Sequence, residues 1–235
     1  MRIAIIGAGM VGRGLAKAAL SCRHDVVLAA RHRDHAAKAA DEVVARAAAS
    51  AEEAVQGADV VVLAVPSTAI ADVCDEIRRH IRQTVVIDPS NPLEPDPALV
   101  LEARMSVAEE VAILLPEARV VKASNTVLGA RLTDPVVHGV RLDGFYAGDD
   151  PEAAVVAGLV AATAFRPLDV GDLRSARSLE HMAFLNISLN ARNGWSWSSG
   201  WKLLGDTRGG SPGRLTAVRA TPPPQRAWRT PRAGA

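Results

Sequence analysis

Several features that would fix a class of protein are scarce in this sequence. Only 3% of its 235 residues are aromatic, it has two cysteines, and it lacks the run of ~20 apolar residues that a membrane span needs. Two cysteines without metal-ligand spacing exclude a disulfide framework and a zinc motif, so we interpret Cys22 and Cys74 as buried free thiols. The apolar segment at the N-terminus is too short for a signal peptide, and we therefore expect a cytoplasmic protein without a membrane partner.

Net charge is also nearly absent, at +1 for the whole chain. It is unevenly distributed, because residues 206–235 hold six arginines and one aspartate and so carry +5, which leaves −4 for residues 1–205. The mildly acidic charge of residues 1–205 argues against nucleic-acid binding. The terminal stretch combines proline, glycine and arginine without apolar periodicity, and this predicts a disordered basic tail at 206–235 after a domain at 1–205.

Glycines near the N-terminus form an informative pattern. In the sequence IAIIGAGMVGRG, Gly7, Gly9 and Gly12 separate an expected strand at residues 2–6 from an expected helix at 10–20. In such a turn the first glycine permits a sharp bend, the second lets a pyrophosphate approach the backbone, and the third lets the helix pack closely. The pattern predicts a dinucleotide-binding site. The alternative is a tight turn without a ligand.

The end of the second expected strand, residues 25–30, indicates which dinucleotide is bound. An NAD site usually has Asp or Glu there to bind the ribose 2′-hydroxyl. This sequence instead continues from Ala30 to Arg31, with His35 and Lys38 beyond. Because a guanidinium can hold a 2′-phosphate that a carboxylate would repel, the strand end favours NADP(H). The alternative is that Arg31 is an ordinary surface arginine.

Strands and helices are expected to alternate along the rest of the chain. Further strands are predicted at 45–49, 59–65, 84–88, 119–123, 136–147 and 166–170, and helices at 34–49, 51–57, 67–81, 106–115, 151–164 and 173–192. The first of these strands is short and lies at the end of the helical stretch 34–49. Right-handed connections then favour an α/β fold, a doubly wound, mostly parallel Rossmann-type sheet with a C-terminal helical segment.

Ligands of such sheets lie beyond the C-terminal ends of the strands. The groups that follow strands directly are Gly7 to Val11, Val65-Pro66, Ser90-Asn91-Pro92 and Ser124-Asn125-Thr126, although serine, asparagine and proline are common in any turn. None of the six histidines follows a central strand, and Lys122 lies within its strand. We therefore expect no catalytic side chain and no metal site. Hydride transfer between two stacked cofactor rings fits a site that supplies only orientation.

Several motifs resemble one family of reductases. They are GAGMVGRG, VLAVP at 62–66, VVKASNTV at 120–127, AGDDPEA at 147–153 and RPLDVGDLRSAR at 166–177. Together they are similar to NADPH-dependent coenzyme F420 reductases, over about residues 1–205. The resemblance implies a homodimer that moves a hydride between nicotinamide C4 and deazaflavin C5 without an obligatory side-chain acid or base.

The same resemblance assigns residues to the parts of a cofactor site. Within the glycine turn, the pyrophosphate would be held by Ala8, Gly9, Met10 and Val11. The 2′-phosphate would face Ala30, Arg31 and His35, and the nicotinamide ribose would lie over Val65 and Pro66. The second ring would be bordered by residues 125–129, from Asn125 to Gly129. Family members carry histidine in place of Asn125 and lysine in place of His35.

Three tryptophans occur within the sequence NGWSWSSGWKLLG. Trp195, Trp197 and Trp201 could pack against a dimer partner, wall a planar ring, or simply close the edge of the sheet. Two alternatives to the F420 reductase also stay open. One is an NAD(P)H-binding sensor or interaction module without catalysis, and the other is an NADPH reductase with another small acceptor.

Overall fold

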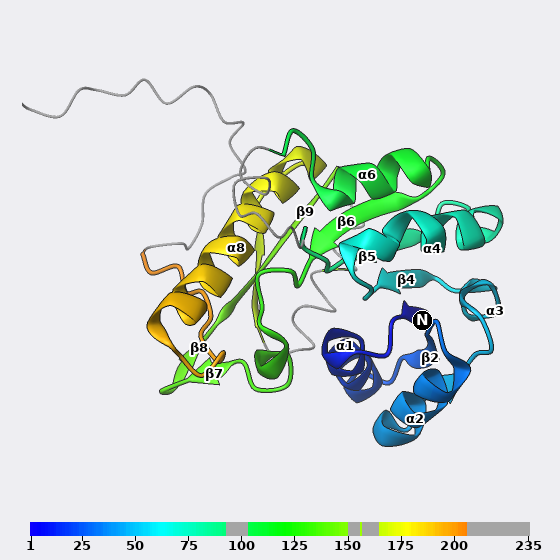
Figure 1. Cartoon of the computed structure of the whole chain (residues 1–235), viewed down its shortest axis with the longest axis horizontal. Helices are drawn as coiled ribbons and strands as arrows, with labels where there is room; N and C mark the ends of the chain where they lie inside the picture. Colours follow the sequence, from blue (N-terminus) through cyan, green and yellow to red (C-terminus); the bar gives the residue numbers. More distant parts are fainter. Residues whose placement is uncertain (93–102, 150–155, 157–164, 206–235) are drawn as a thin grey trace, which may run out of the picture. The chain divides into compact units, whose positions relative to one another are not determined.

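The computed structural model describes residues 1–92, 103–149, 156 and 165–205, and it contains an eight-stranded sheet (Figure 1). The strand order is β10-β9-β6-β5-β4-β1-β2-β3. The six strands β1 to β6 all run parallel to one another. β9 pairs with β6 in the antiparallel direction, and β10 runs parallel to β9. This confirms the doubly wound, mostly parallel sheet, whose strand order reverses between β1 and β4.

The first half of the chain forms strands β1 to β4 of the sheet and the helices between them. Its elements are β1 (Arg2–Ile6), α1 (Met10–Ser21), β2 (Asp25–Ala29), α2 (Arg33–Val43), β3 (Arg46–Ala47), α3 (Ala51–Val55) and β4 (Val60–Leu63). A 3-10 turn, η1 (Ser67–Ala69), leads into α4 (Ile70–Ile77), which ends in a second turn, η2 (Arg78–His80). All four residues of β4 are buried, as expected for a β-branched run covered on both faces.

The second half adds the remaining strands and the long C-terminal helix. Its elements are β5 (Val85–Asp88), α6 (Val107–Leu114), β6 (Arg119–Ala123), η3 (Gly129–Arg131), β7 (Val136–Val137), β8 (Val140–Arg141), β9 (Asp143–Gly148), β10 (Arg166–Asp169), η4 (Leu173–Ser175) and α8 (Ala176–Asn193). Ser106 opens α6 with a complete capping box, because its side chain accepts from the Glu109 amide while the Glu109 carboxylate accepts from the Ser106 amide. This confirms the predicted start of α6, and the observed bounds of β6 confirm the strand predicted at 119–123.

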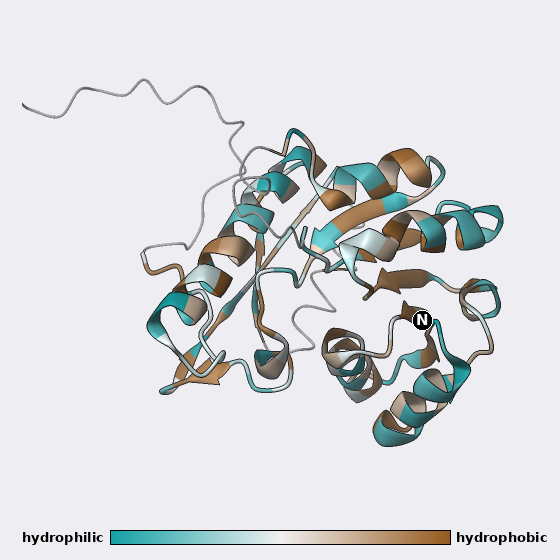
Figure 2. Cartoon of the chain, viewed as in Figure 1, coloured by the Kyte–Doolittle hydropathy of each residue, from teal (hydrophilic) through white to brown (hydrophobic). Residues whose placement is uncertain are grey.

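The core consists of two apolar layers, one on each face of the sheet. Alternate residues of the strands, such as Ile3 and Ile5, pack with α1 and α2, whereas Ala4 and Ile6 belong to the layer under α3, α4 and α6. Figure 2 shows the apolar colouring of β4 and much of β6 and the hydrophilic outer side of α2. A smaller cluster lies between β9 and α8 and includes Trp201 at its margin.

Two expectations for secondary structure are wrong. The strand expected at 136–147 is interrupted, because His138 and Gly139 take φ of 49° and 78° and reverse the chain between β7 and β8 before β9 begins. The helix expected at 34–49 ends at Val43, because Val44 adopts a left-handed conformation and residues 46–47 pair with β2 instead. The short third strand within 45–49 is confirmed.

The two cysteines differ from the expectation that both are buried. Cys22 is exposed because it is the C-cap residue of α1 and lies beyond the apolar side of that helix, which faces the sheet. Cys74 lies within α4 and is buried, and this burial raises the pKa of its thiol to about 12. Neither cysteine is paired.

Contacts divide the chain into a compact unit of residues 1–203 and a second unit of residues 204–235. The tail expected at 206–235 and the helix expected at 151–164 lie outside the described residues, apart from Val156. Within the described residues, no helix is both long enough and apolar enough to span a membrane.

Candidate functional site

The glycine turn after β1 is shaped by close backbone contacts. Gly7 has φ of +118°, and a Cβ atom there would lie 2.0 Å from the Ala64 carbonyl oxygen; at Gly12 it would lie 1.9 Å from that of Gly7. At Gly9, by contrast, no atom lies within 4 Å of that position. Gly7 and Gly12 are therefore required by packing, whereas the absence of a side chain at Gly9 leaves open space above the turn.

The start of α1 presents unpaired amides to this space. Gly9 is the N-cap, it has no capping side chain, and the first turn contains no acidic residue. The first N–H groups of a helix lack intrahelical acceptors and carry partial positive charge. Met10 and Val11 stand in this first turn, and Met10 is 61% exposed. The site fits a bound diphosphate.

A cleft of about 680 Å³ extends from the glycine turn to the end of β2. It brings together most of the residues assigned from the sequence: Gly7, Ala8, Gly9, Ala30, Arg31, His35, Val65 and Pro66. The cleft is also lined by Arg13, His32, Lys38 and Glu42, and the Glu42 carboxylate lies 3.6 Å from the Arg13 guanidinium. Cationic and imidazole groups thus outnumber carboxylates in this cleft, which suits a phosphate.

Arg13 was not predicted to be part of this site. Its position in α1, one residue after Gly12, gives no signal by itself, because helical arginines are common on surfaces. The structure shows that the first turn of α1 faces α2, so that Arg13 reaches the same cleft as Lys38. Lys38 and His32 were visible in the sequence near Arg31 but were not assigned to phosphate binding.

A second cleft, of about 530 Å³, shares its boundary with the first. The shared residues are Ala30, Arg31, Val65 and Pro66, and the far side consists of Thr68, Asp72 and Glu76 together with Ser50 and its neighbours. The Glu76 carboxylate accepts from the Ala51 amide at 3.0 Å and so holds the start of α3 beside this cleft. Asp72 and Glu76, one helical turn apart on α4, were not predicted from the sequence.

Two asparagines join the loops that follow β5 and β6. Asn91 Nδ2 donates to the Asn125 carbonyl oxygen at 2.9 Å, and Asn125 Nδ2 donates to Asn91 Oδ1 at 2.9 Å. Around them, Ser90 Oγ, Asn125 Oδ1 and Thr126 Oγ1 are buried and have no hydrogen-bond partner in the part of the chain that is described. Unsatisfied buried polar atoms are costly, so this rim is suited to a polar ligand.

The loop after β6 returns to the start of α1. A Cβ atom at Gly129 would lie 2.5 Å from the Met10 sulfur, so Gly129 allows η3 to pack against the first turn of α1. The structure therefore brings the predicted residues Met10, Asn125 and Gly129 to one end of the sheet, on the opposite side of the glycine turn from Arg31.

A buried ionic cluster lies directly behind this rim. Lys122 Nζ is 2.8 Å from Asp88 Oδ2 and 2.6 Å from Glu180 Oε1, and all three side chains are at most 4% exposed. Burial raises the pKa of Glu180, and the charge and hydrogen bond of Lys122 oppose that rise. The sequence placed Lys122 within its strand, which is confirmed, but it gave no sign of either partner.

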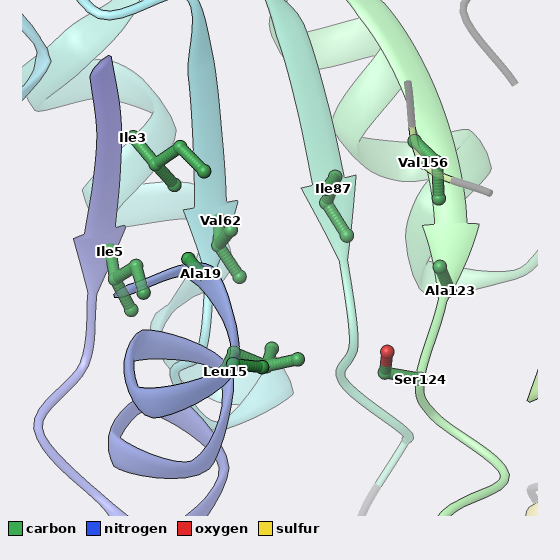
Figure 3. Close-up of a pocket in the computed structure, with 10 residues that line it drawn as sticks. Ile3, Ile5, Leu15, Ala19, Val62, Ile87, Ala123, Ser124 and Val156 are labelled. Carbon is green, nitrogen blue, oxygen red and sulfur yellow. The ribbon is translucent and has the colours of Figure 1, made fainter. Parts of the chain in front are cut away.

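A small apolar cavity between α1 and the sheet is a separate feature (Figure 3). Its volume is about 20 Å³, and side chains from β1, β4 and β5, among them Ile3, Val62 and Ile87, face Leu15 and Ala19 of α1 across it. Such a volume holds about one water molecule at most, and the lining offers few polar partners. It is a packing gap rather than a ligand site. No group of three His, Cys, Asp or Glu side chains that could hold a metal occurs in the described ranges.

Comparison with known proteins agrees with this geometry. A family model described as NADP oxidoreductase, coenzyme F420-dependent, matches residues 2–92. An F420-dependent NADP reductase from Methanothermobacter thermautotrophicus is 33% identical over 211 residues, which cover 82% of this chain and 90% of that protein. This chain belongs to the F420-dependent NADP reductase family.

Two further relatives show how widely the family's fold is shared. A crystal structure of a protein from Arthrobacter species FB24, assigned as an F420-dependent NADP reductase, superposes with a TM-score of 0.77 at 26% identity and covers 86% of this chain and 99% of that one. The rat metalloreductase STEAP3 is 31% identical over 180 residues, 76% of this chain but only 36% of that protein. The chain thus spans about a third of that relative and nearly all of the family reductases.

Proposed function

We propose that this chain is an oxidoreductase that transfers a hydride between NADP(H) and a second redox carrier, the deazaflavin coenzyme F420. The observation that carries the proposal is the cleft at the reversal of strand order, which is lined by both the glycine turn and Arg31. The names of the family reductases support both partners of the reaction. When bound, NADP(H) supplies the hydride donor or acceptor at its nicotinamide ring.

In this proposal different groups of residues bind the different parts of the dinucleotide. The amides around Ala8, Gly9, Met10 and Val11 bind the pyrophosphate, with Gly7 and Gly12 shaping the turn. Arg31, His35 and Lys38 bind the 2′-phosphate next to Ala30. Carboxylates at Asp72 and Glu76 accept from the adenine amine in the second cleft. Val65 and Pro66, which follow β4, support the nicotinamide ribose.

The rim after β5 and β6 borders the second ring in the same proposal. Asn91, Asn125 and Gly129 hold that end of the cleft. Polar contacts come from Asn125 Oδ1 and Thr126 Oγ1, which have no hydrogen-bond partner among the described residues. We assign no side chain as an acid or base, because the chain's task is to orient two rings and exclude water. No metal is assigned.

A direct test is to mix the purified chain with NADPH and oxidised F420 and to follow the absorbance of the deazaflavin. Bleaching that depends on the protein supports the proposal. Inertness toward F420 and toward a panel of other acceptors contradicts it and favours an NAD(P)H-binding sensor. A second candidate, an NADPH reductase with another small acceptor, is favoured by the similarity to the rat metalloreductase; turnover with another acceptor but not with F420 would select it.

We further propose a homodimer located in the cytoplasm. Trp195 and Trp197 are 47% and 48% exposed, as large apolar side chains in a partner interface would be in a separated protomer, whereas Trp201 packs on the cluster between β9 and α8. The two unpaired cysteines support a reducing compartment. We also retain residues 1–205 as the domain that binds NADP and residues 206–235 as a separate basic tail, on the basis of composition.

A further inference from the structure

Lys122 is a fully buried lysine that the proposed reaction does not use. Its ammonium group donates to three acceptors, namely Asp88 Oδ2 at 2.8 Å, the Ser90 carbonyl oxygen at 2.7 Å and Glu180 Oε1 at 2.6 Å. Three acceptors match the three N–H groups of a lysine. The side chain is 0% exposed, so the ammonium does not reach either cleft and cannot contact a ligand there.

Stability alone is a weak explanation for this arrangement. Removing charges from water is expensive, and well-packed apolar residues often replace buried ion pairs with no loss of stability. Here one ammonium faces two buried carboxylates, Asp88 and Glu180, so the cluster does not balance its charge. The hydrogen bonds from this cluster to the main chain of Ser90 indicate a different role.

Asp88 and Lys122 together hold both main-chain groups of Ser90. Asp88 Oδ1 accepts from the Ser90 amide at 2.9 Å, and Lys122 Nζ donates to the Ser90 carbonyl oxygen. The loop leaving β5 is thereby fixed on both sides of this residue. Glu180 links the same ammonium to α8, and its Oε1 also accepts from the Val107 amide at the start of α6, at 2.9 Å.

Ser90 is adjacent in the sequence to the rim of the site. Asn91 follows Ser90, and it exchanges two hydrogen bonds with Asn125, which stands three positions after Lys122 in the sequence. Both halves of the asparagine pair are thus tied to Lys122, one through the loop after β5 and the other through β6. The same hydrogen bonds position Asn125 Oδ1 and Ser90 Oγ, two buried atoms without a partner in the described part of the chain.

We propose that Lys122 is a positioning residue for hydride transfer: through the Ser90 carbonyl it sets the asparagine pair that borders the nicotinamide end of the cleft. The inference rests on the proposed function. It assigns no chemical step to Lys122 and predicts that the adenosine end of the site does not depend on it. Its test must therefore separate the two ends of the dinucleotide.

The test compares two variants in the full-length chain. Lys122→Met leaves two buried carboxylates without their cation and can prevent folding, so the principal variant is the double change Lys122→Met with Glu180→Met, in which Asp88 still holds the Ser90 amide. Glu180→Gln is the matched control, because it removes a charge from the same cluster but keeps an oxygen for Lys122 and for Val107. Folding of each is measured by circular dichroism and thermal denaturation.

Two readouts distinguish positioning from a purely structural role. In the double variant we expect the hydride-transfer rate per folded protein to fall at least about tenfold. Affinity for 2′-phospho-ADP-ribose, which lacks the nicotinamide, should stay within about twofold of wild type. The preference of the wild-type protein for NADP⁺ over this fragment should be lost in the double variant. Glu180→Gln should resemble wild type in both.

Each outcome bears on a different claim. A folded double variant with the wild-type rate and the wild-type preference for NADP⁺ over the fragment would overturn the role of Lys122 and leave the proposed function intact. Wild-type protein that binds neither ligand would overturn the proposed function and this inference with it. Equal losses in the double variant and in Glu180→Gln would show that the Glu180 carboxylate, which both variants lack, matters rather than the hold of Lys122 on Ser90, and would also overturn the inference.

Discussion

Among single residues, Arg31 decides which dinucleotide the chain prefers in our proposal. It stands two residues after the end of β2 and lines both clefts, and His35 and Lys38 line the first cleft with it. The position was visible in the sequence because no carboxylate follows the second strand. What the sequence did not show is that Arg13 joins the same group from α1, since that depends on how α1 and α2 face each other.

Replacing Arg31 by aspartate should act on one cofactor much more than on the other. Arg31→Asp removes charge-assisted hydrogen bonds to the 2′-phosphate and adds a repulsive carboxylate, so the KM for NADPH should rise at least about tenfold, while that for NADH changes by about twofold or less. Arg33→Asp makes the same change of charge nearby, at the start of α2, and should spare the preference. Steady-state kinetics with both cofactors measure this, and equal effects of Arg31→Asp on both would reject the assignment.

The glycines of the turn separate binding from stability. A Cβ atom at Gly9 meets no atom within 4 Å, so Gly9→Ala should leave the melting temperature nearly unchanged, yet it fills the space above the amides and should weaken NADP⁺ binding about tenfold or more. Gly12→Ala instead collides with the Gly7 carbonyl and should destabilise the fold by about 2 kcal/mol or more. Thermal denaturation and calorimetric titration of both variants give the answer. The account fails here if Gly9→Ala binds NADP⁺ like wild type.

At the scale of elements, α6 is tied to α8 by a strong ion pair. Arg177 donates to both carboxylate oxygens of Glu109, at 2.7 and 2.6 Å, while Glu109 also completes the capping box with Ser106. Burial alone would raise the pKa of Glu109, but the hydrogen bonds from Arg177 and Ser106 outweigh it and lower the pKa to about 2. Glu109 therefore stabilises the fold while it is ionised.

This ion pair predicts a specific loss of stability in acid. Because the pKa of Glu109 is lower in the folded chain than in the unfolded chain, its contribution is fully present above about pH 4.5 and is lost as the pH falls toward about 2. Arg177→Met should lower the free energy of unfolding at pH 7, by an amount that solvent screening of the partly exposed arginine limits, and by less near pH 2. Urea denaturation at several pH values measures this difference.

Arg82→Met is the control for that measurement. Arg82 pairs with Glu117 at 2.7 Å, but both side chains are more than half exposed, so its loss should change stability little at either pH. A pH dependence for Arg177→Met no different from that of Arg82→Met would contradict the role given to the ion pair.

Elements whose signals are local were predictable from the sequence, and those that depend on distant pairing were not. The bounds of β1 and β6 were predicted to the residue, since a short apolar run between turn residues specifies each one. β9 was merged with β7 and β8, because the reversal rests on the conformation of His138 and Gly139 rather than on apolar spacing. The Lys122 cluster joins residues 34 and 58 positions apart, which no local pattern reveals.

For the whole molecule, the exposed tryptophans are the basis of the homodimer that we propose. Trp195 and Trp197 lie in the segment that Arg131 tethers to η3 through the Ser198 carbonyl, next to the rim of the site. The double variant Trp195→Ser with Trp197→Ser should shift the protein toward the monomer, because large aromatic side chains dominate such interfaces. Ile113→Ser removes another exposed apolar side chain, on α6, and should not. Light scattering after gel filtration measures the mass, and an unchanged dimer in the tryptophan variant would refute this interface.

Our central claim is that the chain holds NADP(H) across the reversal of strand order, with the diphosphate on the glycine turn and the 2′-phosphate at Arg31. Isothermal titration calorimetry of the wild-type chain with NADP⁺ and with NAD⁺ tests it most directly. We predict one site per chain and at least about tenfold tighter binding of NADP⁺, as expected when a phosphate gains charge-assisted hydrogen bonds. Absence of heat with NADP⁺, or equal affinity for the two dinucleotides, would contradict the claim.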